Sequence, residues 1–184
     1  MSNGFPEGAL LTPAEAQPVT VVGSVLTVGI LGPLEAKSDD STIALGARGR
    51  RAVLALLALT PGRVVSIGAI VDAIWGDDPP ATADNLIQGY VSKLRSLLGA
   101  GSVVTQNPGY RLEGVEVDAV TFTALVERAR TAGASEAAAL LEEALGLWRG
   151  ELLADLDDLD PVRAAAPRRT EARLGAQEAL ARLT

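Results

Sequence analysis

Residues 82–98 read TADNLIQGYVSKLRSLL, and this stretch decides the fold more than any other in the chain. At 100° of rotation per residue its large apolar side chains collect on one arc, which predicts an amphipathic helix with one buried face. The glycine at position 99 marks the end of that helix. The apolar arc holds Leu86, Ile87, Tyr90, Val91, Leu94, Leu97 and Leu98, whereas the opposite arc holds Asn85, Gln88, Gly89, Ser92 and Ser96, flanked by Lys93 and Arg95.

The exposed arc of this helix is polar, small and uncharged between its two basic flanks. Amide side chains such as that of Gln88 can pair with base edges in the major groove of DNA, while the flanking basic residues reach the phosphates. Gly89 would permit a close approach. Because any surface helix of a soluble protein carries a polar stripe, the helix alone leaves DNA binding and a plain solvent-facing surface both open.

Upstream of this helix the sequence predicts a small sheet and two further helices. A helix over 48–60 ends at Pro-Gly, and another begins after Ser66, a residue type that caps helices. The paired prolines of the loop at 76–81 end the second helix. Turn residues separate three short runs of β-forming residues, which indicates antiparallel strands at 25–31, 34–37 and 42–45.

Downstream, residues 103–106 and 110–112 flank Asn-Pro-Gly, which is a strand, turn and strand pattern. Sheet, three helices and hairpin together predict an α+β winged helix-turn-helix with an N-terminal antiparallel sheet. From residue 119 the pattern is wholly helical, which is typical of the opening of an all-α, TPR-like array. The expected helices lie at 119–131, 135–148 and 161–183, and the expected divisions are a flexible leader (1–23), the winged helix (24–115) and the helical domain (116–184).

Composition excludes most kinds of enzyme. The chain of 184 residues has no His and no Cys, which removes triads, thiolate sites and His-ligated zinc. It also lacks a phosphate-binding glycine loop, so we expect no catalysis, no metal and no cofactor. No apolar run approaches the roughly 20 residues that span a bilayer, and the N-terminus lacks a secretory signal, so a cytoplasmic location is expected.

The net charge of −7 is unevenly distributed along the chain. Residues 24–115 hold eight basic and eight acidic side chains, whereas 116–184 hold eight basic and thirteen acidic ones. Neutralising phosphates dominates affinity for nucleic acids. A neutral winged helix therefore keeps a second interpretation open, a protein-interaction module that has lost affinity for DNA and whose acidic helices bind a partner.

Three local charge clusters carry further expectations. The basic run RGRR at 48–51 either contacts DNA phosphates or is ordinary surface charge. Arg168 and Arg169 are expected to form ion pairs among acidic helices.

Trp75 and Trp148 end apolar stripes and are expected to pack in the core. The apolar faces of the helical half are expected to drive self-association or docking onto the winged helix.

The third charge cluster is acidic and comprises Asp155, Asp157, Asp158 and Asp160. Its spacing does not match that of a calcium-binding loop, so a solvated loop between two helices is expected there.

Eight segments of the chain together resemble one family, the Streptomyces antibiotic regulatory proteins. They are LGPLE (31–35), RAVLALL (51–57), RVVS (63–66), AIWGDDPPATA (73–83), NLIQ (85–88), YVSKLR (90–95), PGYRL (108–112) and ALGLWRG (144–150). The resemblance covers the chain apart from the leader. It implies a winged helix of the response-regulator type followed by a bacterial transcriptional activator domain.

The resemblance also implies roles for matching positions. The predicted helix at 82–98 would contact bases or nearby phosphates. Arg95 and Arg51 would contact the DNA backbone, and the wing at 106–111 would contact the minor groove. The loop after the second helix would touch RNA polymerase through Gly76, Asp77, Asp78, Pro79 and Pro80. The full set of expected DNA contacts is Arg48, Arg50, Arg51, Thr82, Asn85, Gln88, Ser92, Lys93, Arg95, Ser96, Gln106, Tyr110 and Arg111.

The resulting hypothesis is a sequence-specific activator of antibiotic biosynthesis genes that recruits RNA polymerase holoenzyme. It would bind double-stranded DNA at direct repeats, as a homodimer or as molecules side by side, without contact with a membrane. The protein-interaction module remains the alternative.

Overall fold

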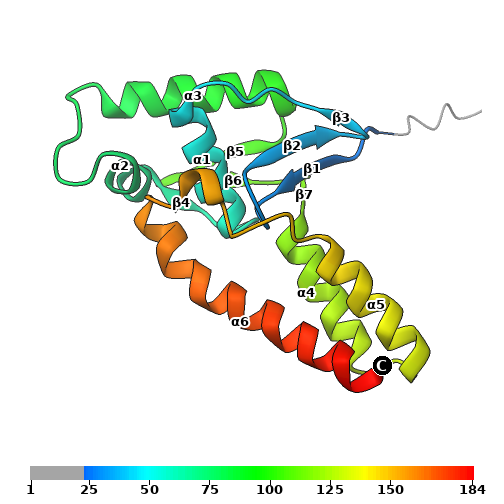
Figure 1. Ribbon diagram of the computed structural model, residues 1–184. Coiled ribbons are helices and arrows are strands. Elements are labelled where there is room, and N and C mark those ends of the chain that lie inside the picture. The colour runs from blue at the N-terminus through cyan, green and yellow to red at the C-terminus, as the bar shows by residue number, and fades with distance from the viewer. Residues whose placement is uncertain (1–22) are drawn as a thin grey trace, which may run out of the picture.

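The structure is a computed structural model that describes residues 23–184, so the expected leader lies outside the described residues apart from Gly23. The N-terminal sheet has the strand order β3-β2-β1-β7 (Figure 1). Its first three strands pair antiparallel, as expected, whereas β7 lies parallel to β1. The strands are β1 (Leu26–Gly29), β2 (Glu35–Ser38), β3 (Ser41–Thr42) and β7 (Glu116–Val117), so the sheet runs past the boundary expected at residue 115.

The predicted winged helix is confirmed. Helices α1 (Arg48–Leu59), α2 (Ile67–Trp75) and α3 (Ala83–Leu98) are followed by the hairpin of β5 (Val103–Gln106) and β6 (Gly109–Leu112). The Ser66 side chain caps α2 by accepting a hydrogen bond from the Ala69 amide at 3.1 Å. A strand that the sequence did not predict, β4 (Val65–Ser66), completes a second sheet in the order β4-β6-β5.

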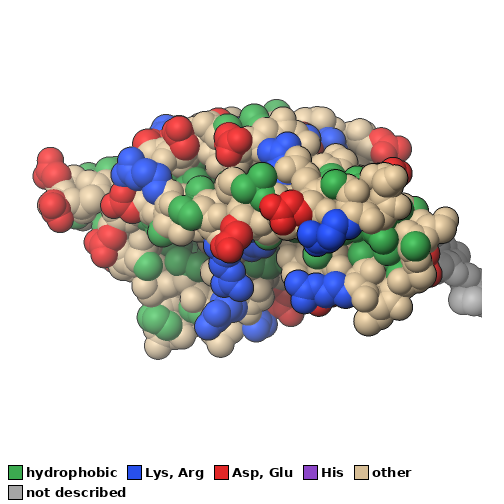
Figure 2. All heavy atoms as spheres, turned by 60° about the horizontal axis from the view of Figure 1, so that its bottom comes forward, with side chains coloured by type: hydrophobic (Ala, Val, Ile, Leu, Met, Phe, Trp, Pro, Cys, Tyr) green, Lys and Arg blue, Asp and Glu red, His purple; other side chains and the backbone are tan. Residues whose placement is uncertain are grey.

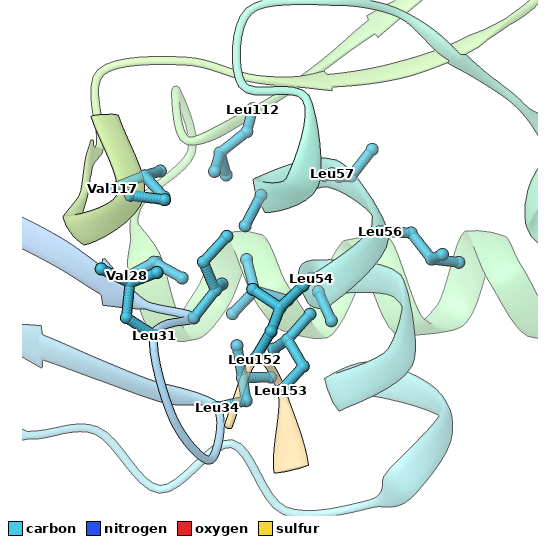
Figure 3. Packing of buried hydrophobic residues seen from close by; sticks show 14 of the residues in the cluster. Val28, Leu31, Leu34, Leu54, Leu56, Leu57, Leu112, Val117, Leu152 and Leu153 are labelled. Carbon is cyan, nitrogen blue, oxygen red and sulfur yellow. The ribbon is translucent and has the colours of Figure 1, made fainter. Parts of the chain in front are cut away.

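A single hydrophobic core connects the winged helix with the segments behind it. Helix α1 crosses its centre, and every residue from 52 to 58 is buried. Figure 3 shows Leu152 and Leu153, which follow α5 in the chain, packed beside Leu34 and Leu54. The helical half is therefore docked on the winged helix, because both halves contribute side chains to one core. Apolar residues of α4, α5 and α6 nevertheless line an open groove between the halves, and the alternative outcome, self-association, stays a prediction.

The helical half has three helices close to their predicted positions: α4 (Asp118–Ala129), α5 (Ala134–Gly146) and α6 (Asp160–Leu183), with a 3₁₀ turn η1 (Ala154–Leu156) before the last. Trp148 is 8% exposed and meets Phe122 edge to face, with ring centroids 5.7 Å apart, so its predicted core position is confirmed. Trp75 is only partly buried. Within residues 23–184 no helix has both the length and the apolar character needed to cross a membrane.

A joint of hydrogen bonds holds the two halves together at the turn between β1 and β2. The Asp118 carboxylate accepts from the amides of Ile30 and Leu31, at 2.8 and 3.0 Å. From the segment after α5, the Arg149 amide donates to the Leu31 carbonyl at 2.7 Å. The Arg149 guanidinium also donates to the Pro33 carbonyl at 2.8 Å. The joint thus fixes the orientation of the helical half relative to the winged helix.

Asp155 extends this joint to α1. Its carboxylate accepts from the Leu34 amide at 2.8 Å and forms an ion pair with Arg51. Asp158 pairs with Arg48 at 2.6 Å. The expectation of a solvated acidic loop therefore fails for the partly buried Asp155, although Asp157, Asp158 and Asp160 are exposed. Sequence distance hides such pairs, because the partners lie more than 100 residues apart.

Asp155→Asn is expected to destabilise the protein by about 1–2 kcal/mol at pH 7, because it removes a charged acceptor from Arg51 and Leu34. Burial raises the pKa of Asp155, but the hydrogen bonds from Leu34 and Arg51 outweigh it and hold this pKa below its ordinary 3.8. The stabilisation is thus present above pH 3.8 and is lost as the pH falls through the lowered pKa. Urea denaturation at pH 7 and near pH 2.5 measures this, and an equal loss at both pH values would contradict it.

Candidate nucleic-acid interface

Helix α3 lies on the side of the molecule away from α4, α5 and α6 (Figure 1). Its inner face is held by Ile87, Val91 and Leu94, each at most 1% exposed. All the predicted contact residues of its other face are exposed, namely Thr82, Asn85, Gln88, Ser92, Lys93 and Ser96. The structure thus brings these six residues together on one solvent-facing surface, which we call the α3 surface.

One detail of α3 differs from the sequence prediction, and another adds to it. Leu86, assigned to the core arc, is 38% exposed, whereas Ala83 and Ile87 in the same part of α3 are buried. Gly89 lies on the α3 surface, and a Cβ atom added there would meet no atom within 4 Å. The middle of the α3 surface is therefore open to a large partner.

Arg95 ties α3 to the wing. Its Nε donates to the Val103 carbonyl at 2.8 Å, and its Nη2 donates to the Thr105 hydroxyl at 2.8 Å. No carboxylate in residues 23–184 lies within ion-pair distance of Arg95, so its charge is not neutralised there. Arg95 thus holds β5 beside α3 while keeping a positive charge at the junction. The role of Thr105 was not predicted, because its hydroxyl meets Arg95 only through the packing of β5 beside α3.

The three predicted contacts in the wing differ in their exposure to solvent. Gln106 is exposed at the end of β5. Arg111 is half-buried and forms an ion pair with Glu113 at 2.8 Å. Tyr110 is 6% exposed and belongs to the hydrophobic core, so we withdraw it from the predicted DNA contacts. The alternation along β6 explains this, because Tyr110 and Leu112 face the core together.

The basic run at the start of α1 is not part of the α3 surface. Arg48 and Arg51 are paired with Asp158 and Asp155, and Arg51 also donates to the Leu34 carbonyl. Arg50 lies over Gly46. Because Arg48 and Arg51 have carboxylate partners within the protein, we withdraw both from the predicted phosphate contacts. The pairs also offset the unfavourable placement of cations at the N-terminus of a helix.

The loop between α2 and α3 is an exposed acidic turn. Every residue from Gly76 to Pro80 is exposed, including Asp77 and Asp78. Gly76 ends α2 with a φ of 62°, and its amide donates to the Asp72 carbonyl. A positive φ of this size favours glycine, which explains the residue at the turn. The loop adjoins the first turn of α3, so a protein bound to it would lie beside DNA bound to the α3 surface.

Two family models match the chain: "Transcriptional regulatory protein, C terminal" over residues 40–112 and "Bacterial transcriptional activator domain" over 117–184. The regulatory protein AfsR of Streptomyces coelicolor is 39% identical over 70% of this chain and 14% of its own length. DnrI of Streptomyces peucetius is 33% identical over 84% of this chain and 63% of its own length.

A solved structure is also similar, that of Mycobacterium tuberculosis EmbR in complex with a low-affinity phosphopeptide. The two structures superpose with a TM-score of 0.79 and 34% sequence identity, over 87% of this chain and 45% of that one. The chain therefore spans less than two thirds of the length of these relatives. With both domains matched in order, the chain belongs to the family of the Streptomyces antibiotic regulatory proteins.

Proposed function

We propose that this protein is a sequence-specific DNA-binding transcriptional activator in which α3 reads the major groove and the wing contacts the adjacent backbone or minor groove. One observation carries the proposal. The polar face of α3 is exposed, open above Gly89 and joined to the wing by the half-buried Arg95. A helix held in this way presents amides to base edges and cations to phosphates.

The proposed DNA contacts are fewer than the sequence alone suggests. They comprise Thr82, Asn85, Gln88, Ser92, Lys93, Arg95 and Ser96 on or beside α3, Gln106 and Arg111 in the wing, and Arg50 at the edge. By family resemblance, the loop at 76–80 would contact RNA polymerase in the cytoplasm, and the regulated genes would be those of antibiotic biosynthesis. Two molecules side by side on direct repeats would place two such loops on one face of the promoter.

The test is a binding-site selection from genomic fragments, followed by gel shifts at two salt concentrations. A recurring motif, with much tighter binding than to random DNA, supports the activator. Equal and weak binding to all fragments favours the alternative, a protein-interaction module. The observation behind that alternative is charge, since residues 24–115 carry as many acidic as basic side chains.

Gln88→Ala is expected to relax the preference at one base position by about 1–3 kcal/mol, because a bidentate amide contact with adenine is lost. Non-specific affinity should hardly change, since no charge is removed. The measurement is a repeated site selection with the variant. Return of the wild-type motif at every position would show that Gln88 reads no base and would direct the same test to Asn85.

Arg95→Ala is expected to weaken binding to all DNA sequences alike and to lower the slope of log affinity against log salt by about one unit, as loss of one phosphate contact predicts. Gel shifts over a salt series measure both quantities. Arg128→Ala is the matched control, because Arg128 is an exposed residue of α4. An unchanged slope for Arg95→Ala would assign this residue to holding the wing alone.

A further inference from the structure

A groove of about 1570 Å³ lies between the winged helix and the helical half. The end of α1 and parts of β4 and α2 form one side, while α4, α5 and α6 form the other. Figure 2 shows this lower face of the molecule, where basic side chains stand beside hydrophobic ones. The apolar lining includes Leu56, Leu59, Phe122, Val126, Leu141 and Ala176.

The rim of the groove is positively charged, in contrast to the chain as a whole. Four arginines line it against two glutamates, whereas the net charge of the protein is −7. Arg130 is paired with Glu127 at 3.3 Å. In the part of the chain that the structure describes, no carboxylate lies within ion-pair distance of Arg168, Arg169 or Arg182. The prediction that Arg168 and Arg169 form ion pairs is therefore wrong.

Arg169 shows the consequence of this missing compensation. Its side chain is half-buried in the groove, and burial, together with the charge of Arg168, lowers the pKa of its guanidinium, although the charge of Asp118 acts in the opposite direction. A partly desolvated cation without a carboxylate at ion-pair distance is unfavourable. A carboxylate entering the groove would relieve that cost, so the groove is complementary to an acidic partner.

We propose that this groove binds an acidic amphipathic helix of a partner protein. The apolar stripe of the helix would lie on Leu59, Val126 and their neighbours, and its carboxylates would face Arg168, Arg169 and Arg182. This is helix-in-groove recognition, read through apolar anchors at helical spacing. Duplex DNA fits the groove less well, because its charged backbone offers no apolar surface that could pack against the apolar lining.

Binding there would couple the partner to the winged helix. Because α1, β4 and α2 form one wall of the groove, a bound helix touches the half that carries α3 and the activator half at the same time. The inference does not depend on DNA binding by α3, since the α3 surface and the groove share none of their residues.

The experiment uses the full chain and a fluorescent synthetic peptide of about 15 residues, long enough for marginal helix formation. The probe carries Leu at positions i, i+3, i+4, i+7 and i+11 and Glu on both flanks. One companion peptide carries Lys in place of Glu, and another has the same composition with the Leu positions scrambled. Anisotropy should show saturable binding of the Glu peptide, at least tenfold tighter than that of either companion.

Charge reversal in the groove supplies the second arm. Arg168→Glu/Arg182→Glu should weaken binding of the Glu peptide by about tenfold or more and reverse the order of the Glu and Lys peptides. Both side chains are exposed, so the fold should persist, which circular dichroism verifies. Arg168→Gln gives a milder test that should lower affinity several-fold. Arg128→Glu, on α4 but outside the groove, should leave binding unchanged.

Four results would overturn the proposal. They are absence of saturable binding up to millimolar peptide, equal binding of Glu and Lys peptides, an affinity unaffected by the double reversal, and displacement of the peptide by random duplex DNA. A dimer in sedimentation equilibrium that disappears in Arg168→Glu/Arg182→Glu would instead assign the groove to a second copy of the chain.

Discussion

Gly109→Ala is expected to destabilise the protein by about 3 kcal/mol or more and to lower its urea midpoint accordingly. Gly109 opposes Ser66 where β6 pairs with β4. A Cβ atom at Gly109 would overlap the Val65 carbonyl oxygen and come within 2.7 Å of the Ser66 Cα atom. Both neighbours are backbone atoms, so relief requires separation of the two strands. Because β6 also forms the wing, DNA affinity should fall with stability.

Gly89→Ala is the matched control for this prediction. A Cβ atom at Gly89 meets nothing within 4 Å, and alanine is the better helix former by about 0.8–1 kcal/mol, so stability should rise. If α3 lies deep in the major groove, DNA affinity should nevertheless fall, which separates folding from binding. A Gly109→Ala protein with the wild-type midpoint would show that β4 and β6 are not held at the described distance.

Asp118→Ala is expected to cost about 2–4 kcal/mol, because it leaves the Ile30 and Leu31 amides without their acceptor in a partly buried joint. It also removes a carboxylate that lies 3.6 Å from the Arg149 guanidinium. Urea denaturation measures the loss, and hydrogen exchange at residues 30 and 31 should localise it. Asp157→Ala, at an exposed position in the loop before α6, should change stability by less than about 0.5 kcal/mol.

The pH dependence of Asp118→Asn should be opposite to that of Asp155→Asn. Burial raises the pKa of Asp118 above its ordinary 3.8, despite the amide hydrogen bonds and Arg149, which lower it. The folded protein then binds this proton more tightly than the unfolded chain, so ionisation destabilises wild type as the pH rises through the raised pKa. The loss caused by Asp118→Asn should therefore shrink from pH 3 to pH 7, and a growing loss would contradict this assignment.

Local patterns account for most of what could be predicted. The helix at 83–98 was visible because its apolar residues repeat with helical period, and α2 was visible because Ser66 caps it and the prolines at 79–80 follow it. The wing was visible from a turn between two short runs of β-formers. By contrast, β4 and β7 are two residues long each, too short to show alternation, and both exist only through their partner strands.

In the candidate site, too, some residues could be predicted from local patterns and others could not. The exposed residues of α3 follow from the period of one helix, and the six that form the α3 surface are all exposed in the structure, whereas Arg95 is half-buried. Arg51 and Tyr110 were misjudged because a charged or aromatic side chain looks the same in sequence whether it faces solvent, the core or another domain. Their surroundings come from Asp155, 104 residues away, and from the packing of β6 on the core.

The sequence by itself determined the helices, the winged hairpin, the polar face of α3 and the order of the two domains, because each depends on spacing within a few residues and on the stretches that resemble the family. Only the tertiary structure decided which arginines have carboxylate partners, how Asp118 and Arg149 join the two halves, and that Arg168, Arg169 and Arg182 line a groove. The physical reason is that charge pairing and desolvation depend on distances between distant segments, which helical and strand periodicity do not encode.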